Sequence, residues 1–282
     1  MNASARASPE SAESSSDVAR VQVPAFVNCR DRLTPLRALV EWLERAGCDE
    51  IYLLDNDSAY EPLLEWYEQT PHTVVRLGHN YRKRALWSAP GVFELTRGRR
   101  FIYSDPDIVP VEECPLDAIE RFSRLLDRFP GVNKAGFGLK IDDLPDHYRH
   151  KQAVLLWEGQ AWQLPVGHGA YLAAIDSTFA LYREGAGIRP ADAIRTGPPY
   201  VARHTDWYLD LDDLSEEDAF YRARGNPRHW AAPELPEWLA NETQRLRTRP
   251  PSPLRRAYVR LRAAPRVHWT LRGRSILRRK RG

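Results

Sequence analysis

The segment Phe101-Ile-Tyr-Ser-Asp-Pro-Asp-Ile-Val-Pro110 joins a short apolar run to a pair of carboxylates. Residues Phe101–Ser104 predict a buried strand, and Asp105 and Asp107 follow it on either side of a proline that restricts the backbone. Two carboxylates at this spacing suit Mg²⁺ or Mn²⁺, because both cations take oxygen ligands and are commonly shared with the phosphates of a substrate. The same residues also suit a plain surface turn.

Strands and helices alternate upstream of this segment. Strands are predicted over Val21–Val27, Ile51–Leu54 and Thr73–Leu77. Helical spacing of apolar residues follows each of them, over Leu33–Ala46, around 63–67 and over Ala89–Thr96. Because this alternation implies right-handed crossovers, we expect an α/β fold with a mostly parallel sheet and helices on both faces. Farther on, a helix is expected over Leu116–Arg128 and strands near 135–141, 171–175 and 178–182.

Polar residues follow each of the four predicted strands. They are Asn28, Arg30 and Asp31 after the first, Asp55, Asn56 and Asp57 after the second, His79, Asn80 and Arg82 after the third, and Asp105 and Asp107 after the fourth. Ligands of open α/β sheets bind at the carboxyl ends of the strands, so we expect these loops to form one binding rim. Within it, Asp55 could accept a hydrogen bond from the N–H of a pyrimidine base, whereas Asp57 could cap the following helix.

Acids and a histidine in the second half are candidates for the chemistry. Asp176 follows a predicted strand, where it could act as a general base or cap a helix. His204 lies two residues before Asp206 in a polar, aromatic segment and could bind a metal or fill a structural role. Glu217 and Asp218 begin a predicted helix, where Asp218 forms a capping arrangement with the serine three residues earlier.

Composition bounds the class of protein. The chain has 282 residues, 43% of them apolar, which suffices for a sizeable core. Residues 1–20 are rich in Ser, Ala and Glu and lack aromatics, which predicts a disordered N-terminal segment. Cys29, Cys48 and Cys114 have no spacing typical of a disulfide framework or a zinc site, so we expect them in the core. No run of about 18 apolar residues and no secretory signal pattern occurs, so we expect a cytoplasmic protein.

In order and spacing, these motifs resemble the GT-A glycosyltransferases related to family 2, most closely their bacterial polysaccharide-type branch. The resemblance covers about residues 22–230 and rests on Asn28-Cys-Arg30, Leu54-Asp-Asn-Asp-Ser58, Asn80-Tyr-Arg-Lys-Arg-Ala-Leu-Trp87, Asp105-Pro-Asp107, Lys134–Pro145, Ala174–Arg183 and Ala202–Tyr208. The chain departs from the commoner family 2 pattern at Asp55-Asn56, where two adjacent acids are usual, and it lacks a clean Gln-Arg-x-Arg-Trp.

This resemblance implies a GT-A (Rossmann-like) domain over 21–242, with a nucleotide-binding half over about 21–110 and an acceptor half over about 111–242. It implies an inverting enzyme that moves a sugar from a UDP- or GDP-type nucleotide sugar to a hydroxyl of a glycan or a lipid-linked acceptor. The nucleotide-sugar ligands would be Asn28, Arg30, Asp55, Asp57, Asn80, Arg84 and Asp105. The ligands of Mn²⁺ or Mg²⁺ would be Asp105, Asp107 and His204. The catalytic base would be either Asp176 or one of Glu217 and Asp218, because many family 2 enzymes carry it in a Glu-Asp pair at a helix start.

Residues 243–282 form a basic C-terminal tail with 14 Arg or Lys and no acid. Because the whole chain sums to only +3, the first 242 residues carry an excess of acids. Apolar residues interleave with the basic ones, a composition that suits peripheral contact with an anionic membrane at its inner face, at about 1 kcal/mol per basic residue near the surface. Nucleic acid is the less expected partner, although the charge alone would attract it.

Two other functions stay open. A nucleotidyltransferase of sugar phosphates would use a similar sheet, metal and acids. It should carry a glycine-rich loop after the first strand, which Val27–Pro35 lacks. A non-enzymatic membrane or nucleic-acid adaptor would act through the basic tail alone.

Overall fold

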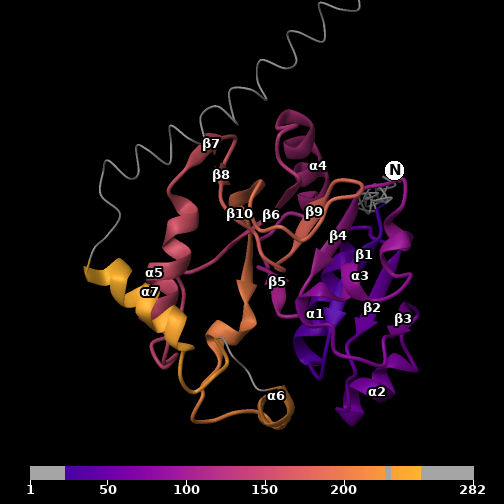
Figure 1. Ribbon diagram of the computed structural model, residues 1–282, viewed down its shortest axis with the longest axis horizontal. Helices are drawn as coiled ribbons and strands as arrows, with labels where there is room; N and C mark the ends of the chain where they lie inside the picture. The colour runs from indigo at the N-terminus through magenta and orange to yellow at the C-terminus, as the bar shows by residue number, and fades with distance from the viewer. Residues whose placement is uncertain (1–22, 226–229, 249–282) are drawn as a thin grey trace, which may run out of the picture.

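The computed structural model describes residues 23–225 and 230–248 (Figure 1). The predicted N-terminal segment 1–20, and the tail beyond residue 248, lie outside the described residues. The four predicted N-terminal strands are confirmed as β1 (Ala25–Cys29), β2 (Ile51–Asp55), β3 (Thr73–Arg76) and β4 (Phe101–Ser104). They are parallel in the order β3-β2-β1-β4, so their carboxyl ends meet at one edge of the sheet.

The connecting helices follow the sequence pattern in part. Helices α1 (Thr34–Arg45) and α2 (Glu61–Tyr67) lie where apolar residues recur with helical spacing. The helix predicted over Ala89–Thr96 is wrong: α3 (Ala85–Ser88) ends before it, and the 3₁₀ turn η2 covers only Phe93–Thr96. Ala89 is extended at ψ 131° because it precedes a proline, and Gly91 then takes a φ of 76°, so the chain turns at this point.

The second half adds six strands and a predicted helix. They are β5 (Ile108–Pro110), α4 (Ala118–Arg128), β6 (Lys134–Leu139), β7 (Pro165–Gly167), β8 (Ala170–Leu172), β9 (Ala180–Tyr182) and β10 (Ala193–His204). The sheet continues from β4 as β9-β6-β10-β8-β7, with β5 paired to the end of β10. A single sheet therefore runs through both predicted halves.

The expectation of a mostly parallel sheet is wrong, because the ten-stranded sheet is mixed. Strand β9 lies antiparallel to both β4 and β6, and β8 lies antiparallel to both β7 and β10. A parallel connection needs a crossover of about a dozen or more residues, usually with a helix. The segments that join β7, β8 and β9 are short and contain no helix, so this part of the chain cannot extend the parallel pattern.

Helices pack on both faces of the sheet, as predicted. Val27 of β1 joins a large apolar core with α1 and α4, whereas the neighbouring Phe26 joins a second core with α3 on the opposite face. The three cysteines are buried and free, as expected from their spacing.

Three more helices lie in the second half: α5 (Lys151–Glu158), α6 (Glu216–Gly225) and α7 (Glu237–Thr248). Helix α7 packs on α5, with the rings of Trp157 and Trp238 5.8 Å apart (Figure 1). The predicted start of the tail at residue 243 falls inside α7, where Thr243 and Leu246 are buried. Within 23–225 and 230–248, no helix has the length and apolarity needed to cross a membrane.

Candidate metal and nucleotide site

Side chains from three neighbouring strand ends join in one hydrogen-bonded line. Asn56, after β2, donates to the side-chain oxygen of Asn28 in β1 and accepts a bond from the backbone N–H of Tyr81 at 2.9 Å. Asn28 in turn donates through Nδ2 to Oδ1 of Asp105 at 3.1 Å. The predicted rim therefore forms, and it brings Asn28 and Asp105 together with Asn56.

The two carboxylates of the Asp-Pro-Asp segment lie in different surroundings. Burial raises the pKa of Asp105 to about 7, and the charge of Asp107 adds to the effect. Burial also raises the pKa of Asp107, while the nearby His204 and Arg32 pull it down. Asp107 Oδ1 is buried and has no hydrogen-bond partner in the structure, although the site is rich in polar groups. A buried oxygen in this state is the kind of atom that a cation satisfies.

Asp107, His204 and Asp206 form a group in which one ligand atom from each lies within 4.8 Å of the others. Antiparallel pairing of β5 with β10 brings them together, since Ile108 is the register partner of His204. His204 Nδ1 lies 3.6 Å from Asp107 Oδ2, is buried and has no hydrogen-bond partner among the residues that the structure describes. Two carboxylates and an imidazole are a donor set for a divalent cation, and the nitrogen favours Mn²⁺ over Mg²⁺.

Of the three predicted metal ligands, the structure places Asp107 and His204 in this group but sets Asp105 in the network of Asn28. Asp206, in the 3₁₀ turn η4 (Thr205–Tyr208), completes the group instead. The sequence carried a pattern for it, because His204 and Asp206 have the same two-residue spacing as Asp105 and Asp107. The ring of His204 is fixed by stacking on Trp207, with centroids 4.9 Å apart.

Arg32, in the loop between β1 and α1, is a functional candidate that the sequence pattern did not single out. Its side chain is 5% exposed, and Nη1 donates to Asp206 Oδ1 at 2.8 Å. Nη2 lies 3.3 Å from Asp218, Nε lies 3.6 Å from Glu217, and the ring of Tyr221 packs 5.0 Å from the guanidinium carbon. Burial lowers the pKa of Arg32, but Asp206 and other acids outweigh it and hold that pKa above its usual range.

The predicted catalytic acids Glu217 and Asp218 are engaged in holding α6. Glu217 is 7% exposed and accepts bonds from the backbone N–H of Thr34 at 3.0 Å and from its hydroxyl at 2.9 Å. Because no side chain near α1 caps that helix, Glu217 supplies its N-terminal cap from another element. Asp218 accepts from the hydroxyl of Ser215 at 2.6 Å and donates its N–H back to that hydroxyl at 3.1 Å.

Asp176, the third predicted catalytic acid, lies beside Asp105, whose pKa its charge helps to raise. Its carboxylate is half exposed and accepts a bond from Lys83 at 2.6 Å. Its backbone carbonyl accepts from the buried Lys134 at 3.2 Å, and Lys134 also donates to the hydroxyl of Tyr182 at 3.1 Å. Burial lowers the pKa of Lys134 to about 8. Of the three predicted catalytic acids, Asp176 has the most exposed carboxylate.

Asp55, the predicted base-binding acid, is 4% exposed. Its carboxylate accepts from the backbone N–H of Ser58 at 3.2 Å, from the hydroxyl of Tyr67 at 3.5 Å and from Arg76 at 3.4 Å. These contacts fix the carboxylate at the end of β2. Asp57 is exposed with a φ of 64°, a conformation that suits a tight turn.

The remaining predicted nucleotide ligands lie in the loops around this rim. Arg30 lies 3.8 Å from Asp31, a fully buried acid that accepts bonds from the backbone N–H groups of two residues after β2. Asn80 accepts a bond from the N–H of Arg82 at 2.8 Å and so shapes the 3₁₀ turn η1 (Arg82–Arg84). Arg84 is exposed.

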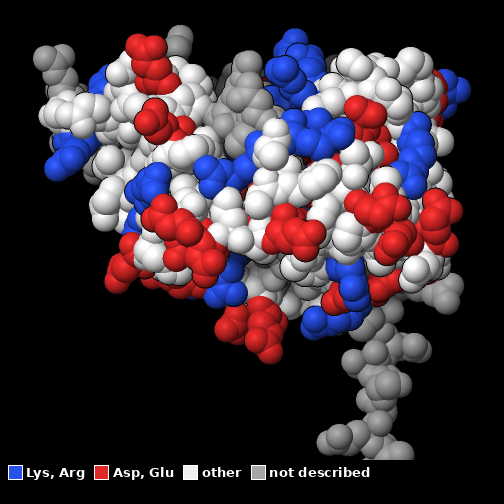
Figure 2. Space-filling model, turned by 90° about the horizontal axis from the view of Figure 1, so that it is seen from below, with Lys and Arg blue, Asp and Glu red and all other residues white. Residues whose placement is uncertain are grey.

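The face that bears this rim has no single predominant surface charge. Figure 2 shows the molecule from the lower edge of Figure 1, where α2 and α6 lie, and acidic and basic groups are both spread across it.

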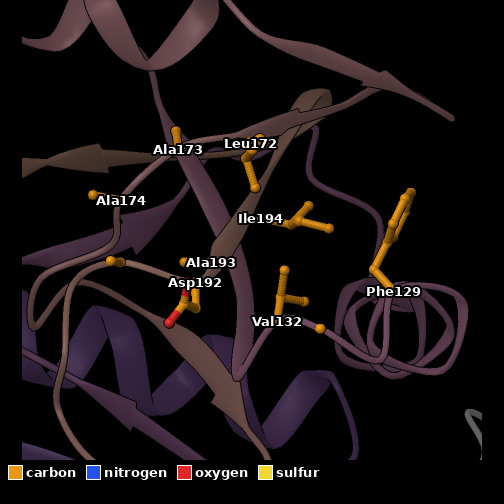
Figure 3. Close-up of a pocket in the computed structure, with 10 residues that line it drawn as sticks. Phe129, Val132, Leu172, Ala173, Ala174, Asp192, Ala193 and Ile194 are labelled. Carbon is orange, nitrogen blue, oxygen red and sulfur yellow. The ribbon is translucent and has the colours of Figure 1, made fainter. Parts of the chain in front are cut away.

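A separate hollow lies elsewhere on the sheet (Figure 3). Apolar side chains of Phe129, Val132, Leu172 and Ile194 line it, next to Asp192. Because Val132 precedes β6 and Ile194 begins β10, the hollow lies at the amino ends of these parallel strands, opposite the candidate site.

Comparison with models of known protein families finds no match to this chain, and neither does a search of curated proteins.

Proposed function

We propose that this protein is a metal-dependent glycosyltransferase of the GT-A type, which moves a sugar from a nucleotide-diphosphate sugar to a hydroxyl of a glycan or lipid-linked acceptor. One observation carries the proposal: Asp107, His204 and Asp206, side chains that could hold a cation, lie next to the Asn28–Asp105 network at the carboxyl ends of parallel strands. Nucleotides bind α/β sheets at such ends. The sequence resemblance, which rests partly on the same residues, points to the same class of enzyme.

The divalent cation fits the residues present. Asp107 and His204 each hold a buried polar atom without a hydrogen-bond partner in the described part of the chain, and Asp206 adds a carboxylate within 4.8 Å. A bound Mn²⁺ would offset the negative charge that develops on the leaving diphosphate. Arg32 is buried among several acids near this group, and its single positive charge does not balance theirs. A divalent cation would therefore improve the local charge balance.

The donor would lie along the rim. The loop at Arg30 would hold the nucleoside, and Asp105, oriented by Asn28, would contact the ribose or diphosphate. The buried carboxylate of Asp55 is already bonded to Ser58, Tyr67 and Arg76, so it would shape the end of β2 rather than contact the base. Asp105 is oriented from both sides, because its backbone N–H also donates to the carbonyl of Ser177 at 2.9 Å. Such fixed geometry is what positioning a donor requires.

Asp176 is the acid we assign as the base that deprotonates the acceptor hydroxyl. Its ion pair with Lys83 is half exposed, and pairs of this kind contribute about 0–1 kcal/mol. A donor diphosphate would attract Lys83 and free the carboxylate at little cost. Glu217 and Asp218 are already committed to Thr34, Ser215 and Arg32, so neither is available to a substrate.

The test is a donor screen with purified full-length protein, Mn²⁺ and a panel of UDP- and GDP-sugars, in which release of the nucleoside diphosphate is measured. Calorimetric titration with Mn²⁺ alone gives the metal affinity. Asp107→Asn is expected to abolish both signals. Asp127→Asn is the matched control, because Asp127 lies on α4 and pairs with Arg100 at the amino end of β4.

Two results would overturn the proposal. The first is the absence of Mn²⁺ binding and of diphosphate release with every donor. The second is the release of pyrophosphate from a nucleoside triphosphate and a sugar phosphate, which would identify a nucleotidyltransferase.

A further inference from the structure

Arg32 lies between two groups of acids that come from distant parts of the chain. On one side are Asp206 and Asp107, two of the three candidate cation ligands, whose charges both raise the pKa of Arg32. On the other side are Glu217 and Asp218 at the start of α6. The guanidinium is buried, and its Nε has no hydrogen-bond partner in the structure because Glu217 lies 3.6 Å away.

Only a side chain with two separate N–H donor groups, such as a guanidinium, can bind acids on both sides at once. Nη1 donates to Asp206 at 2.8 Å while Nη2 lies 3.3 Å from Asp218, so one planar group spans the two acids. Tyr221 of α6 packs against the guanidinium, with 5.0 Å between its ring centroid and the central carbon, and limits its movement. Helix α6 therefore fixes Arg32, and Arg32 fixes the Asp206 carboxylate.

We propose that Arg32 is a positioning residue of the metal centre, which holds Asp206 with a carboxylate oxygen directed to Asp107 and His204. The inference rests on the proposed function, since it takes these three residues as cation ligands. It extends that function by giving α6 a part in it: through Asp218, the helix keeps Arg32 in place and so prepares the site before the cation arrives.

The sign of the effect separates positioning from simple electrostatics. A positive charge next to a cation site repels the cation, so electrostatics alone predicts that Arg32→Gln binds Mn²⁺ more tightly and that Arg32→Lys binds it like the wild type. Positioning predicts that both variants bind more weakly, because neither side chain has the fork that reaches Asp206 and Asp218 together. Outer-shell partners of metal ligands typically change affinity by about 10–100-fold.

The experiment is a calorimetric titration of the full chain with Mn²⁺ alone, checked by the electron paramagnetic resonance signal of free Mn²⁺. We expect Arg32→Gln and Arg32→Lys to weaken binding at least about 10-fold. In an Asp206→Asn background the same changes should have no further effect, because Arg32 acts through Asp206. Unchanged or tighter binding in Arg32→Gln, or an equal loss in both backgrounds, overturns the proposal.

A second pair of variants covers the case in which Arg32 variants do not fold. Asp218→Asn weakens the hold of α6 on Arg32, whereas Glu216→Gln removes the same charge from an exposed acid in the same first turn of α6. We expect Asp218→Asn to weaken Mn²⁺ binding severalfold and Glu216→Gln to leave it unchanged; equal effects of the two overturn the part assigned to α6. If the wild type neither binds Mn²⁺ nor releases a nucleoside diphosphate from any donor, the proposed function itself fails. If it releases the diphosphate without binding Mn²⁺, only this inference fails. If the wild type binds Mn²⁺ and the Arg32 and Asp218 variants bind it equally well, this inference fails and the proposed function stands.

Discussion

Replacing Glu217 distinguishes a structural acid from a catalytic one. Its carboxylate accepts two bonds from Thr34, at 3.0 Å from the backbone N–H and 2.9 Å from the hydroxyl, and lies 3.6 Å from Nε of Arg32. With 7% of the residue exposed, water cannot replace these partners. Glu217→Ala should therefore destabilise the fold, while turnover of the remaining folded protein changes little.

The size of the loss follows from three contributions. A lost helix cap costs about 1 kcal/mol, and a hydrogen bond to a charged group contributes about 1.5–3 kcal/mol. Breaking a buried ion pair costs about 3–5 kcal/mol when the partner is left alone, but Arg32 keeps Asp206 and Asp218. Since these contributions overlap, we expect a loss of about 2–3 kcal/mol for Glu217→Ala, or a Tm lower by about 4–12 °C. Glu217→Gln keeps an acceptor for Thr34 and should lose about 1 kcal/mol.

Urea denaturation followed by circular dichroism gives the free energy of unfolding of each variant. Release of nucleoside diphosphate from the best donor of the screen gives kcat, which should stay within about threefold of the wild type for Glu217→Gln. A general base contributes about 10²–10⁴-fold to the rate. Wild-type stability of Glu217→Gln together with a kcat at least about 100-fold lower would refute the structural assignment and restore Glu217 as the base.

Three further predictions address the base, a buried lysine and a close backbone contact. Asp176→Asn should give the reverse result, with a Tm close to the wild type because the side chain is half exposed and a kcat lower by about 10²–10⁴-fold; a normal kcat would remove Asp176 as the base. Lys134 has a folded pKa of about 8 against an ordinary 10.5, so above pH 8 the folded protein loses this proton while the unfolded chain keeps it. The free energy of unfolding of the wild type relative to Lys134→Met should therefore rise between pH 8 and 10.5, by about 3 kcal/mol at most. Urea denaturation of both proteins across this range measures the difference, and a difference that does not change with pH would contradict the prediction. Gly138→Ala would place a Cβ 2.3 Å from the carbonyl oxygen of Thr196 and should lower the free energy of unfolding by at least about 2 kcal/mol. Gly159→Ala meets no atom within 4 Å and should change it by less than about 1 kcal/mol. Similar free energies of unfolding for the two variants would contradict this prediction, because they would mean that β6 and β10 separate at little cost.

The sequence by itself determined the parallel half of the sheet and the place where polar groups gather. Strands β1 to β4 and helix α1 follow from apolar periodicity, which is a local property of the chain. Because parallel strands end at one edge, the residues after them had to meet there, and Asn28 and Asp105 do. The prediction over Ala89–Thr96 failed because a proline within it outweighed the helical spacing.

Only the tertiary structure decided which of these groups work together. Arg32 and Asp206 are 174 positions apart, and Thr34 and Glu217 are 183 positions apart, so no local pattern could pair them. Asp206 takes its place beside Asp107 because β10 returns antiparallel to β5, and that pairing comes from the packing of the mixed sheet. The sequence could name the acids, but burial and partners assign each one its part. Glu217 is enclosed against the N-terminus of α1 and caps it, whereas Asp176 stays half exposed, which is why we propose it as the base.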